Sequence, residues 1–312
     1  MSRHTDEQPG TSNMRLRFWG VRGSIPTPGE STVRYGGNTP CTEIRLGNDE
    51  LIILDAGTGI RKLGDQLMAR GQSVHATVLI THPHWDHIQG FPFFKPAFVS
   101  GNTLVIVGTE RPEKKLSEIV SDQMNRIYFP VQLNELKATL TFRPVKDEQN
   151  LDVYGAKVRT MYVNHPGFTV AYRIEFNGKT LVYISDNEPY DRGAAASLEN
   201  FEDLVKDKFE ETNGDPNQRV FEFCRDADLL IHDATYTPEE YVDRVGWGHS
   251  HYLFALRVAA EAGVRKLCLF HHDPNHSDND VDKIVKACRN EIKRMGYSFE
   301  CFAAEENLEL EL

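Results

Sequence analysis

Three histidines and an aspartate stand within six positions of one another, directly after the strongly apolar segment 76–81. In an extended chain alternate side chains point the same way, so His82 and His84 share a side, and a following turn can direct Asp86 and His87 to a neighbouring point. Neutral imidazole and carboxylate groups bind zinc, manganese or iron(II). The grouping has too many ligands for one tetrahedral ion that also keeps a water. We therefore infer two adjacent divalent ions.

Further motifs occur in the order found in the metallo-β-lactamase superfamily, whose signature H-x-H-x-D-H the chain resembles at 82–87. Segments resembling its first, third, fourth and fifth motifs are Leu-Asp-Ala-Gly-Thr-Gly at 54–59, Asn-His at 164–165, Ser-Asp at 185–186 and Leu-Phe-His at 269–271. The resemblance covers residues 14 to about 275. It implies an α/β fold, the αββα sandwich, with two mixed β-sheets face to face, helices on both outer sides and metals at one edge.

The resemblance also implies which side chains hold the ions. Seven are expected: His82, His84 and His165 for one ion, Asp86, His87 and His271 for the other, and Asp186 bridging both together with a hydroxide. Asp55 is expected behind them, where a carboxylate accepts the remaining N–H of a ligand and holds that imidazole in one orientation and tautomer. His272 is an alternative to its neighbour His271, which we favour because it falls where the family's strand places it.

Two later segments resemble ribonuclease Z, the tRNA 3′-end-processing branch of this superfamily. His-Asp-Ala-Thr at 232–235 resembles its H-E-A-T segment, with Asp233 replacing glutamate. Gly-His-Ser at 248–250 resembles its G-H-S-T segment, with His251 replacing threonine. Taken alone, histidines just before a helix could equally be capping-region residues. The motif order favours a catalytic role, and His251 either contacts the phosphate or faces solvent.

The chemistry implied by this resemblance is the cleavage of a phosphodiester. A metal-bound hydroxide attacks phosphorus, and the departing alkoxide then needs a proton. We expect His249 to be the general acid, with Asp233 orienting it and raising its pKa, and Asp86 to belong to the same catalytic group.

The expected substrate is small. Only twenty residues separate His165 from Asp186, which leaves no room for the long arm that holds tRNA in ribonuclease Z. The chain also carries 46 acidic against 35 basic residues, a net charge of -11, which disfavours long nucleic acid as a partner. The pattern resembles armless relatives that cut cyclic nucleotides or other small phosphodiesters.

The runs 20–29 and 34–39, rich in glycine and proline, resemble a bacterial subgroup of these proteins. Their loops are expected at the mouth of the pocket, where Arg22, Arg34 or Asn38 would meet substrate. The alternative is that the glycines and prolines only shape tight turns.

These features predict a dinuclear metal-dependent hydrolase, a phosphodiesterase with two ions per chain. Zinc is favoured, and manganese or iron would also suit the ligands. Alternatives on the same fold are a tRNA 3′-processing-type endoribonuclease and a thioester or lactone hydrolase. A non-hydrolytic alternative is a di-iron redox protein or sensor, although those relatives typically carry glutamate where His84 stands. The last is a degenerate binding module.

Most of these residues stand at the ends of segments that read as strands. The apolar and β-rich segments are 14–19, 41–46, 51–56, 76–81, 103–108, 139–145, 158–165, 169–176, 179–186, 226–234 and 266–272. Most are apolar nearly throughout, as expected for strands that are covered on both faces. Asn177-Gly178 predicts a tight hairpin turn between two of them. Apolar residues at helical spacing predict helices at 251–262, 278–295 and within 60–71.

We expect one domain over 14–312, since the chain shows neither repeats nor a long linker. The polar residues 1–13 lack the apolar run of a signal peptide and predict a disordered tail. The segment 187–223, with ten acids and four bases and a helix near 198–210, predicts an acidic surface insertion or, alternatively, a lid.

The composition also bears on membrane partners and on the state of the cysteines. No stretch approaches the ~18 apolar residues of a membrane span, so we expect no membrane partner. The five cysteines form no C-x-x-C pair and predict idle thiols in a reducing cytoplasm. Homodimers are common among such relatives, but no interface stripe can be read in the sequence.

Overall fold

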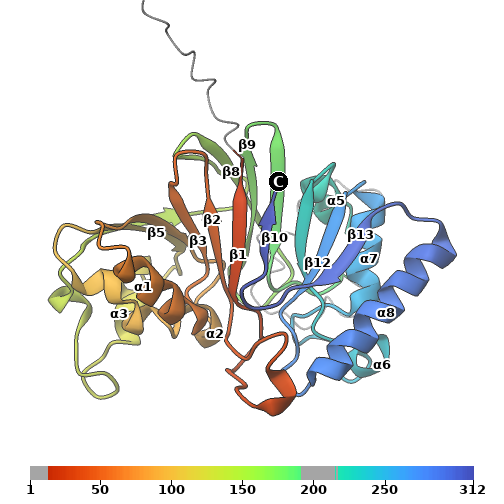
Figure 1. Cartoon of the computed structure of the whole chain (residues 1–312), viewed down its shortest axis with the longest axis horizontal. Coiled ribbons are helices and arrows are strands. Elements are labelled where there is room, and N and C mark those ends of the chain that lie inside the picture. The colour runs from red at the N-terminus through yellow and green to blue at the C-terminus, as the bar shows by residue number, and fades with distance from the viewer. Residues whose placement is uncertain (1–12, 191–214, 216) are drawn as a thin grey trace, which may run out of the picture.

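Two seven-stranded β-sheets form the centre of the molecule (Figure 1). The first sheet, in spatial order, consists of β14 (Glu309–Glu311), β1 (Arg15–Gly20), β2 (Cys41–Arg45), β3 (Leu51–Leu54), β4 (His75–Leu79), β5 (Thr103–Thr109) and β6 (Thr139–Val145). The second consists of β13 (Glu300–Ala303), β12 (Lys266–Phe270), β11 (Leu229–Asp233), β10 (Lys179–Ile184), β9 (Val170–Phe176), β8 (Ala156–Tyr162) and β7 (Asn150–Val153).

Both sheets mix parallel and antiparallel pairs. Strands β3 to β6 are parallel to one another, as are β10 to β13, whereas the other pairs are antiparallel. The helices are α1 (Gly59–Ala69), α2 (Trp85–Ile88), α3 (Leu116–Asp122), α5 (Gln218–Cys224), α6 (Pro238–Tyr241), α7 (Tyr252–Glu261) and α8 (Asp278–Met295). Short 3-10 turns are η1 (Glu30–Thr32), η2 (Phe91–Phe93), η3 (Lys95–Phe98) and η4 (Leu133–Glu135).

Three apolar layers hold these elements together. The middle layer lies between the sheets and includes Phe18, Tyr183 and Phe270. The two outer layers pack α1 and α3 on the first sheet and α5, α7 and α8 on the second, which places helices on both outer sides (Figure 1). Burial of this apolar surface is the main favourable term in the folding of such a sandwich. The predicted αββα fold with two mixed sheets is therefore confirmed.

The structure, a computed structural model, describes residues 13–190, 215 and 217–312. Residues 1–12 of the expected tail lie outside it, as do residues 191–214 and 216 of the acidic segment, with the helix expected near 198–210. Both described ends of that segment contribute to the interior. Asn187 and Glu188 are buried, and α5 contributes Val220, Phe221 and Phe223 to an outer core layer.

Local sequence signals account for several elements. Asn177 and Gly178 both adopt positive φ and join β9 to β10, so the predicted hairpin turn is confirmed. The amphipathic α8 begins after the N-cap Ser277, whose hydroxyl accepts the N–H of Asp280, and ends at the left-handed Gly296. The expected helices correspond to α7, α8 and α1.

Other elements had no clear sequence signal. Strands β7, β13 and β14 are short, and β14 reads Glu-Leu-Glu, so it lacks the apolar run by which the other strands were predicted. The β6 strand forms an edge of its sheet and is half exposed, because only one neighbouring strand pairs with it.

All five cysteines are buried and form no disulfide, and no helix in the described ranges is long and apolar enough to cross a membrane.

The topology brings the ends of parallel strands to one edge of the sandwich. Asp55 follows β3, and His82 follows β4 in the first sheet. Asp186 follows β10, Asp233 ends β11, and His271 follows β12 in the second. Carboxyl ends of parallel strands are where α/β proteins build their sites, because backbone groups there leave the ladder and side chains turn outward.

Candidate metal centre

The seven expected ligands converge at this edge, although they come from distant parts of the chain. Metal-binding atoms lie within 4.8 Å of one another in five triplets: His82, His84 and His165; Asp86, His87 and His271; His82, His87 and Asp186; His165, Asp186 and His249; and Asp233, His249 and His271. The first two triplets are the two groups that the sequence motifs predict.

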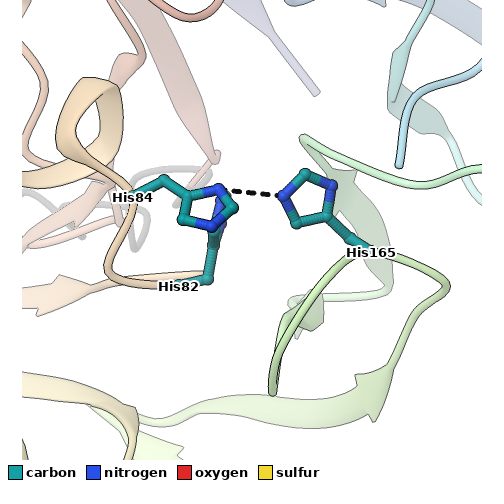
Figure 2. Close-up of side chains that lie close together, drawn as sticks. All are labelled: His82, His84 and His165. Carbon is teal, nitrogen blue, oxygen red and sulfur yellow. Dashed lines mark hydrogen bonds between the residues drawn. The ribbon is translucent and has the colours of Figure 1, made fainter. Parts of the chain in front are cut away.

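The first triplet joins the two sheets. Figure 2 shows His82 and His84 facing His165 across the site. His84 Nδ1 lies 3.0 Å from His165 Nε2. The His165 Nδ1–H donates to the carbonyl of Gly248 at 2.8 Å, so in the neutral ring Nε2 carries a lone pair directed into the site.

The second triplet lies beside the first. Asp86 Oδ2 is 3.2 Å from His87 Nε2 and 3.1 Å from His271 Nε2. His272 points elsewhere, since its Nε2 donates to the carbonyl of Ala304 at 2.9 Å. The structure thus places His271 in the cluster and leaves His272 outside it.

Asp186 stands between the triplets. Its carboxylate oxygens lie within 3.2 to 3.8 Å of imidazole nitrogens of five histidines: His87, His271, His82, His165 and His249. Burial opposes ionisation of this carboxyl, but the facing imidazoles outweigh burial and hold its pKa well below its usual range. A carboxylate that faces two groups of imidazoles is suited to bridge two cations.

Two ligand-bearing strands end in an unusual backbone conformation. Asp55 and His271 both lie in the left-handed region, with φ of 58° and 59°. That region is uncommon for residues other than glycine, and such strain persists where the surroundings enforce it, often at functional sites. Here it bends the chain away from β3 and β12 immediately after the last ladder residue and turns both side chains toward the cluster.

Hydrogen bonds behind the cluster set the orientation of the rings. The Asp55 carboxylate accepts His87 Nδ1–H at 2.9 Å and the hydroxyl of Tyr183 at 2.8 Å. Thr81 donates to the same carboxylate from its backbone N–H at 2.8 Å. His271 Nδ1 contacts the hydroxyl of Thr235 at 3.1 Å. In each ring the outer nitrogen has a partner, which leaves Nε2 directed into the site.

Replacement of Asp55 by asparagine is expected to weaken metal binding by roughly 10- to 100-fold. The reason is that a neutral amide oxygen accepts the His87 N–H more weakly than the charged carboxylate does. The measurement is a competition titration with a metallochromic chelator. Tyr183→Phe is the matched control, since it removes a neutral partner of the same carboxylate and should weaken binding less. Equal affinity for Asp55→Asn and the unmodified protein would contradict this role.

The donor set fits divalent metal. His82 Nε2, His87 Nε2 and Asp186 Oδ1 are buried and have no hydrogen-bond partner in the described residues. Such orphaned groups are costly in a protein interior, and a cation would satisfy all three. Burial lowers the pKa of His82 well below its usual range and that of His165 to about 3, so both rings are neutral and can donate lone pairs.

His249 and Asp233 form a pair at the rim of the cluster. Asp233 Oδ2 accepts His249 Nδ1–H at 3.0 Å, and the Asp233 carboxyl is fully buried. Burial alone would lower the pKa of His249, but Asp233 and then Asp186 raise it to about 9. The ring stacks on His271 with centroids 4.8 Å apart, which places it directly over the second triplet.

Arg22 is placed differently from the expectation that it meets substrate. Arg22 is fully buried, donates to the carbonyls of Gly36 and His276, and pairs with Asp278 at 3.5 Å. Its donors face the interior because the loop folds over the chain after β12, which corrects its assignment as a substrate ligand.

Two other candidates at the predicted pocket mouth also have internal partners. The Asn38 amide donates to Glu306 at 2.9 Å, and its contact with substrate stays a prediction. Arg34 pairs with Asp282 at 2.6 Å. His251 is half-buried, precedes α7 without a side-chain cap bond, and its ring lies 5.0 Å from that of Tyr241.

The run 20–29 does reach the cluster, through its backbone. Ser24 donates its N–H to Asp86 Oδ2 at 2.8 Å. Gly23 packs flat on the ring of His271, and a Cβ atom at Gly23 would lie 2.2 Å from that ring. Only glycine fits such an approach, so the glycine in this run is needed by the site itself.

Glu188, which was not among the residues predicted for the site, holds the loop that carries His249. This buried carboxylate accepts the N–H of Gly246 at 2.6 Å and of Gly248 at 2.8 Å, and the hydroxyl of Tyr241 at 2.8 Å. Its only sequence signal is its position two residues after Asp186. Its inclusion in the acidic segment concealed that signal.

Comparison with known proteins agrees with this geometry. The Beta-lactamase superfamily domain matches residues 51–209, which are 159 of the 312 residues. Ribonuclease Z of Thermoplasma acidophilum is 28% identical over 310 aligned positions, covering 90% of this chain and 93% of that protein.

Solved structures share the fold. The metallo-beta-lactamase fold protein YhfI of Bacillus subtilis superposes with a TM-score of 0.65 at 20% identity, covering 97% of this chain and 100% of that one. Human tRNase Z, short form, superposes with a TM-score of 0.61 at 18% identity, covering 95% and 98%. With the family domain spanning just over half of its length, this chain belongs to the metallo-β-lactamase superfamily and is a ribonuclease Z-like, metal-dependent hydrolase.

Proposed function

We propose that the protein is a phosphodiesterase that cleaves a small, nucleotide-like diester at a centre of two divalent ions. The observation that carries this proposal is the His249–Asp233 pair beside the metal cluster. A metal cluster alone would serve many hydrolases, whereas an imidazolium held beside it supplies what a diester needs, a proton for the departing alkoxide.

We assign His82, His84 and His165 to one ion and Asp86, His87 and His271 to the other, with Asp186 shared. Divalent ions bound there would lower the pKa of a coordinated water and offset charge on the phosphoryl oxygens. Zinc is our first choice because imidazole-rich sites suit it, and manganese or iron would fit the same donors.

Side chains of the protein would hold the proton and transfer it to the leaving group. Asp233 accepts the Nδ1–H of His249, which leaves the Nε2 proton as the one to be transferred to the leaving oxygen. The buried Asp233 carboxylate also stabilises the His249 imidazolium before substrate binds. Glu188 would act as a positioning residue through the 246–248 backbone and would not touch the substrate.

A small substrate is favoured over tRNA. The interval between His165 and Asp186 is filled by β9, the Asn177-Gly178 turn and β10, so no arm is inserted there. Processing of a tRNA 3′ end stays the second candidate function, because the relative from Thermoplasma acidophilum is a ribonuclease Z.

The test of the proposal is a panel of substrates with protein purified without an affinity tag. The panel comprises bis(p-nitrophenyl) phosphate, 2′,3′- and 3′,5′-cyclic nucleotides, an unprocessed tRNA, a thioester and a lactone. We expect turnover of diesters and about two ions per chain by elemental analysis. Thioester or lactone turnover without diester turnover would overturn the substrate class, and preferential tRNA cleavage would favour the second candidate.

Two exposed tryptophans are next in the chain to residues of the centre, and they support a nucleoside as part of the substrate. Trp85 is 79% exposed and follows His84 in the chain. Trp247 is 62% exposed and precedes Gly248, the backbone partner of His165. Large exposed aromatic faces beside a phosphodiester site provide stacking surfaces for bases.

Trp85→Ala is expected to raise the KM for thymidine 5′-(p-nitrophenyl phosphate) roughly tenfold, because base–aromatic stacking contributes about 1–3 kcal/mol. The KM for ethyl p-nitrophenyl phosphate, which has the same leaving group and no base, should stay unchanged. Trp85→Phe is the control that retains an aromatic face. A parallel rise for both substrates would show that Trp85 supports the metal site instead of a base.

A further inference from the structure

One cationic side chain near the centre has no anionic partner at salt-bridge distance among the described residues. Arg111 is half-buried, and no carboxylate lies within 4.0 Å of its guanidinium in the described part of the chain. Burial lowers the pKa of Arg111, and the charge of Glu113, which is not within salt-bridge distance, opposes this shift without outweighing it. The other arginine whose pKa burial lowers is Arg22, and that residue pairs with Asp278. In a chain with a net charge of -11, an unpaired and half-buried arginine calls for an explanation.

The fold carries Arg111 to the same edge as the metal centre. Strand β5 lies parallel to β4, with Leu79 opposite Val107, so the carboxyl ends of the two strands are neighbours. His82 follows β4 by three residues, and Arg111 follows β5 by two. The chain segments that carry these two residues therefore leave the sheet at the same functional edge.

The guanidinium lies against the turn that follows His165. A Cβ atom at Gly167 would lie 2.1 Å from Arg111 Nη2, so the guanidinium occupies the space where a side chain would otherwise be. Gly167 also has a φ of +87°, which favours glycine at this position. Two residues of chain span at most about 7 Å, so the guanidinium lies near the backbone of His165.

Stacking fixes the direction of the side chain. The guanidinium carbon lies 5.2 Å from the ring centre of Phe168, and the Phe168 carbonyl accepts the hydroxyl of Thr109 at 2.7 Å. A stacked arginine keeps its N–H edge free for in-plane bonds to a phosphate, because the aromatic ring takes only its face. No side-chain hydrogen bond of Arg111 is found within the described ranges.

We propose that Arg111 binds a second phosphoryl group of the substrate, next to the diester that is cleaved. The inference rests on the proposed phosphodiesterase function and narrows its substrate class to diesters of a nucleotide that carries a further phosphate. Guanidinium binds phosphate with paired, charge-assisted hydrogen bonds, and partial burial strengthens them. Arg111 is thus a specificity-determining residue, and the proton and metal chemistry remain with the groups described above.

The experiment compares two substrates with one leaving group. Thymidine 5′-(p-nitrophenyl phosphate) and its 3′-phosphorylated form differ only in the second phosphoryl group. We expect Arg111→Ala to lower kcat/KM for the 3′-phosphorylated substrate by roughly 10- to 100-fold and to leave the other within about twofold. Arg111→Lys should lie between, since lysine keeps the charge and loses the paired geometry.

Arg159→Ala is the matched control, because Arg159 also stacks on a phenylalanine, with its guanidinium carbon 5.7 Å from the ring centre of Phe223, but stands in the middle of β8. It should change neither rate. Equal losses on both substrates in Arg111→Ala would show a general structural role and overturn the proposal. Unchanged rates on both would overturn it as well.

A binding measurement separates this inference from the proposed function. Calorimetry with thymidine 3′,5′-bisphosphate and thymidine 5′-monophosphate requires no turnover. We expect the bisphosphate to bind the unmodified protein more tightly, and Arg111→Ala to remove that difference. If the unmodified protein cleaves no diester, the proposed function fails, while this comparison still decides the role of Arg111. Equal affinities for the two nucleotides in the unmodified protein would overturn the inference.

Discussion

Replacement of Asp186 by alanine is expected to abolish hydrolysis and to reduce the metal content well below two ions per chain. Among the described residues, Asp186 is the carboxylate that faces both ligand triplets, at 3.2 Å from His87 and 3.7 Å from His165. Without it, neutral imidazoles would face the cations with one negative charge fewer, and the two ions would lose their shared ligand. Elemental analysis and diester turnover measure the two effects.

The control for Asp186 is another carboxylate that lies mostly out of water. Asp228 has a side chain 12% exposed and accepts the N–H of Thr180 at 2.8 Å, away from the centre. Asp228→Ala should retain both ions and its activity, even if it unfolds at a lower temperature. Full activity in Asp186→Ala with both ions present would contradict the assignment of Asp186 as the shared ligand.

The second large effect is expected for His249→Ala, which should slow the cleavage of diesters with alkoxide leaving groups by about 10² to 10⁴-fold while both ions stay bound. p-Nitrophenolate leaves without a proton, so bis(p-nitrophenyl) phosphate should be cleaved at nearly the unmodified rate. This dependence on the leaving group is specific to a general acid. A loss of metal site geometry would slow both kinds of substrate alike.

His249 also belongs to two triplets that could hold a metal, so metal analysis of His249→Ala is part of the same test. Loss of an ion together with activity would show that His249 is a ligand and that the acid lies elsewhere. Retention of both ions, with the loss confined to alkoxide leaving groups, would support the acid assignment.

The pH dependence follows from the same pair. Asp233 and Asp186, acting against burial, raise the pKa of His249 to about 9. A raised pKa means that the imidazolium, the form that can donate, is present below that value and is lost as the pH rises through it. Its stabilisation of the fold follows the same course, because it is complete below the ordinary histidine pKa near 6.5. Bound cations would bring the fall in rate to lower pH, since positive charge disfavours the imidazolium.

Many residues of the metal centre could be predicted because they stand in short sequence motifs. The ligands at 82–87 are adjacent in the chain, so any turn after the strand brings them together. The other ligands were expected from the order of the motifs that the chain shares with its family, and the structure brings them to the same edge of the sandwich. The choice of His271 over His272 followed from the family's order, and the geometry agrees with it.

Other features depend on contacts between segments that are far apart in the chain. Arg22 resembled a surface residue in a glycine-rich loop, yet it is buried because the chain after β12 closes over it. Glu188 looked like one acid among ten, and only the packing of the 246–248 backbone against it reveals its role. Arg111 carried no motif, and its unpaired charge becomes visible only when its neighbours in space are known.

The sequence by itself determined which groups can hold metal at 82–87, because residue type and spacing are local properties of the chain. The layered fold and the remaining ligands followed from the resemblance of its ordered motifs to the metallo-β-lactamase superfamily. Tertiary structure alone decided which charges are paired, since a carboxylate or guanidinium takes its partner from whatever segment folds against it. Arg22, which pairs with Asp278, and Arg111, for which we propose a phosphate as partner, illustrate that rule.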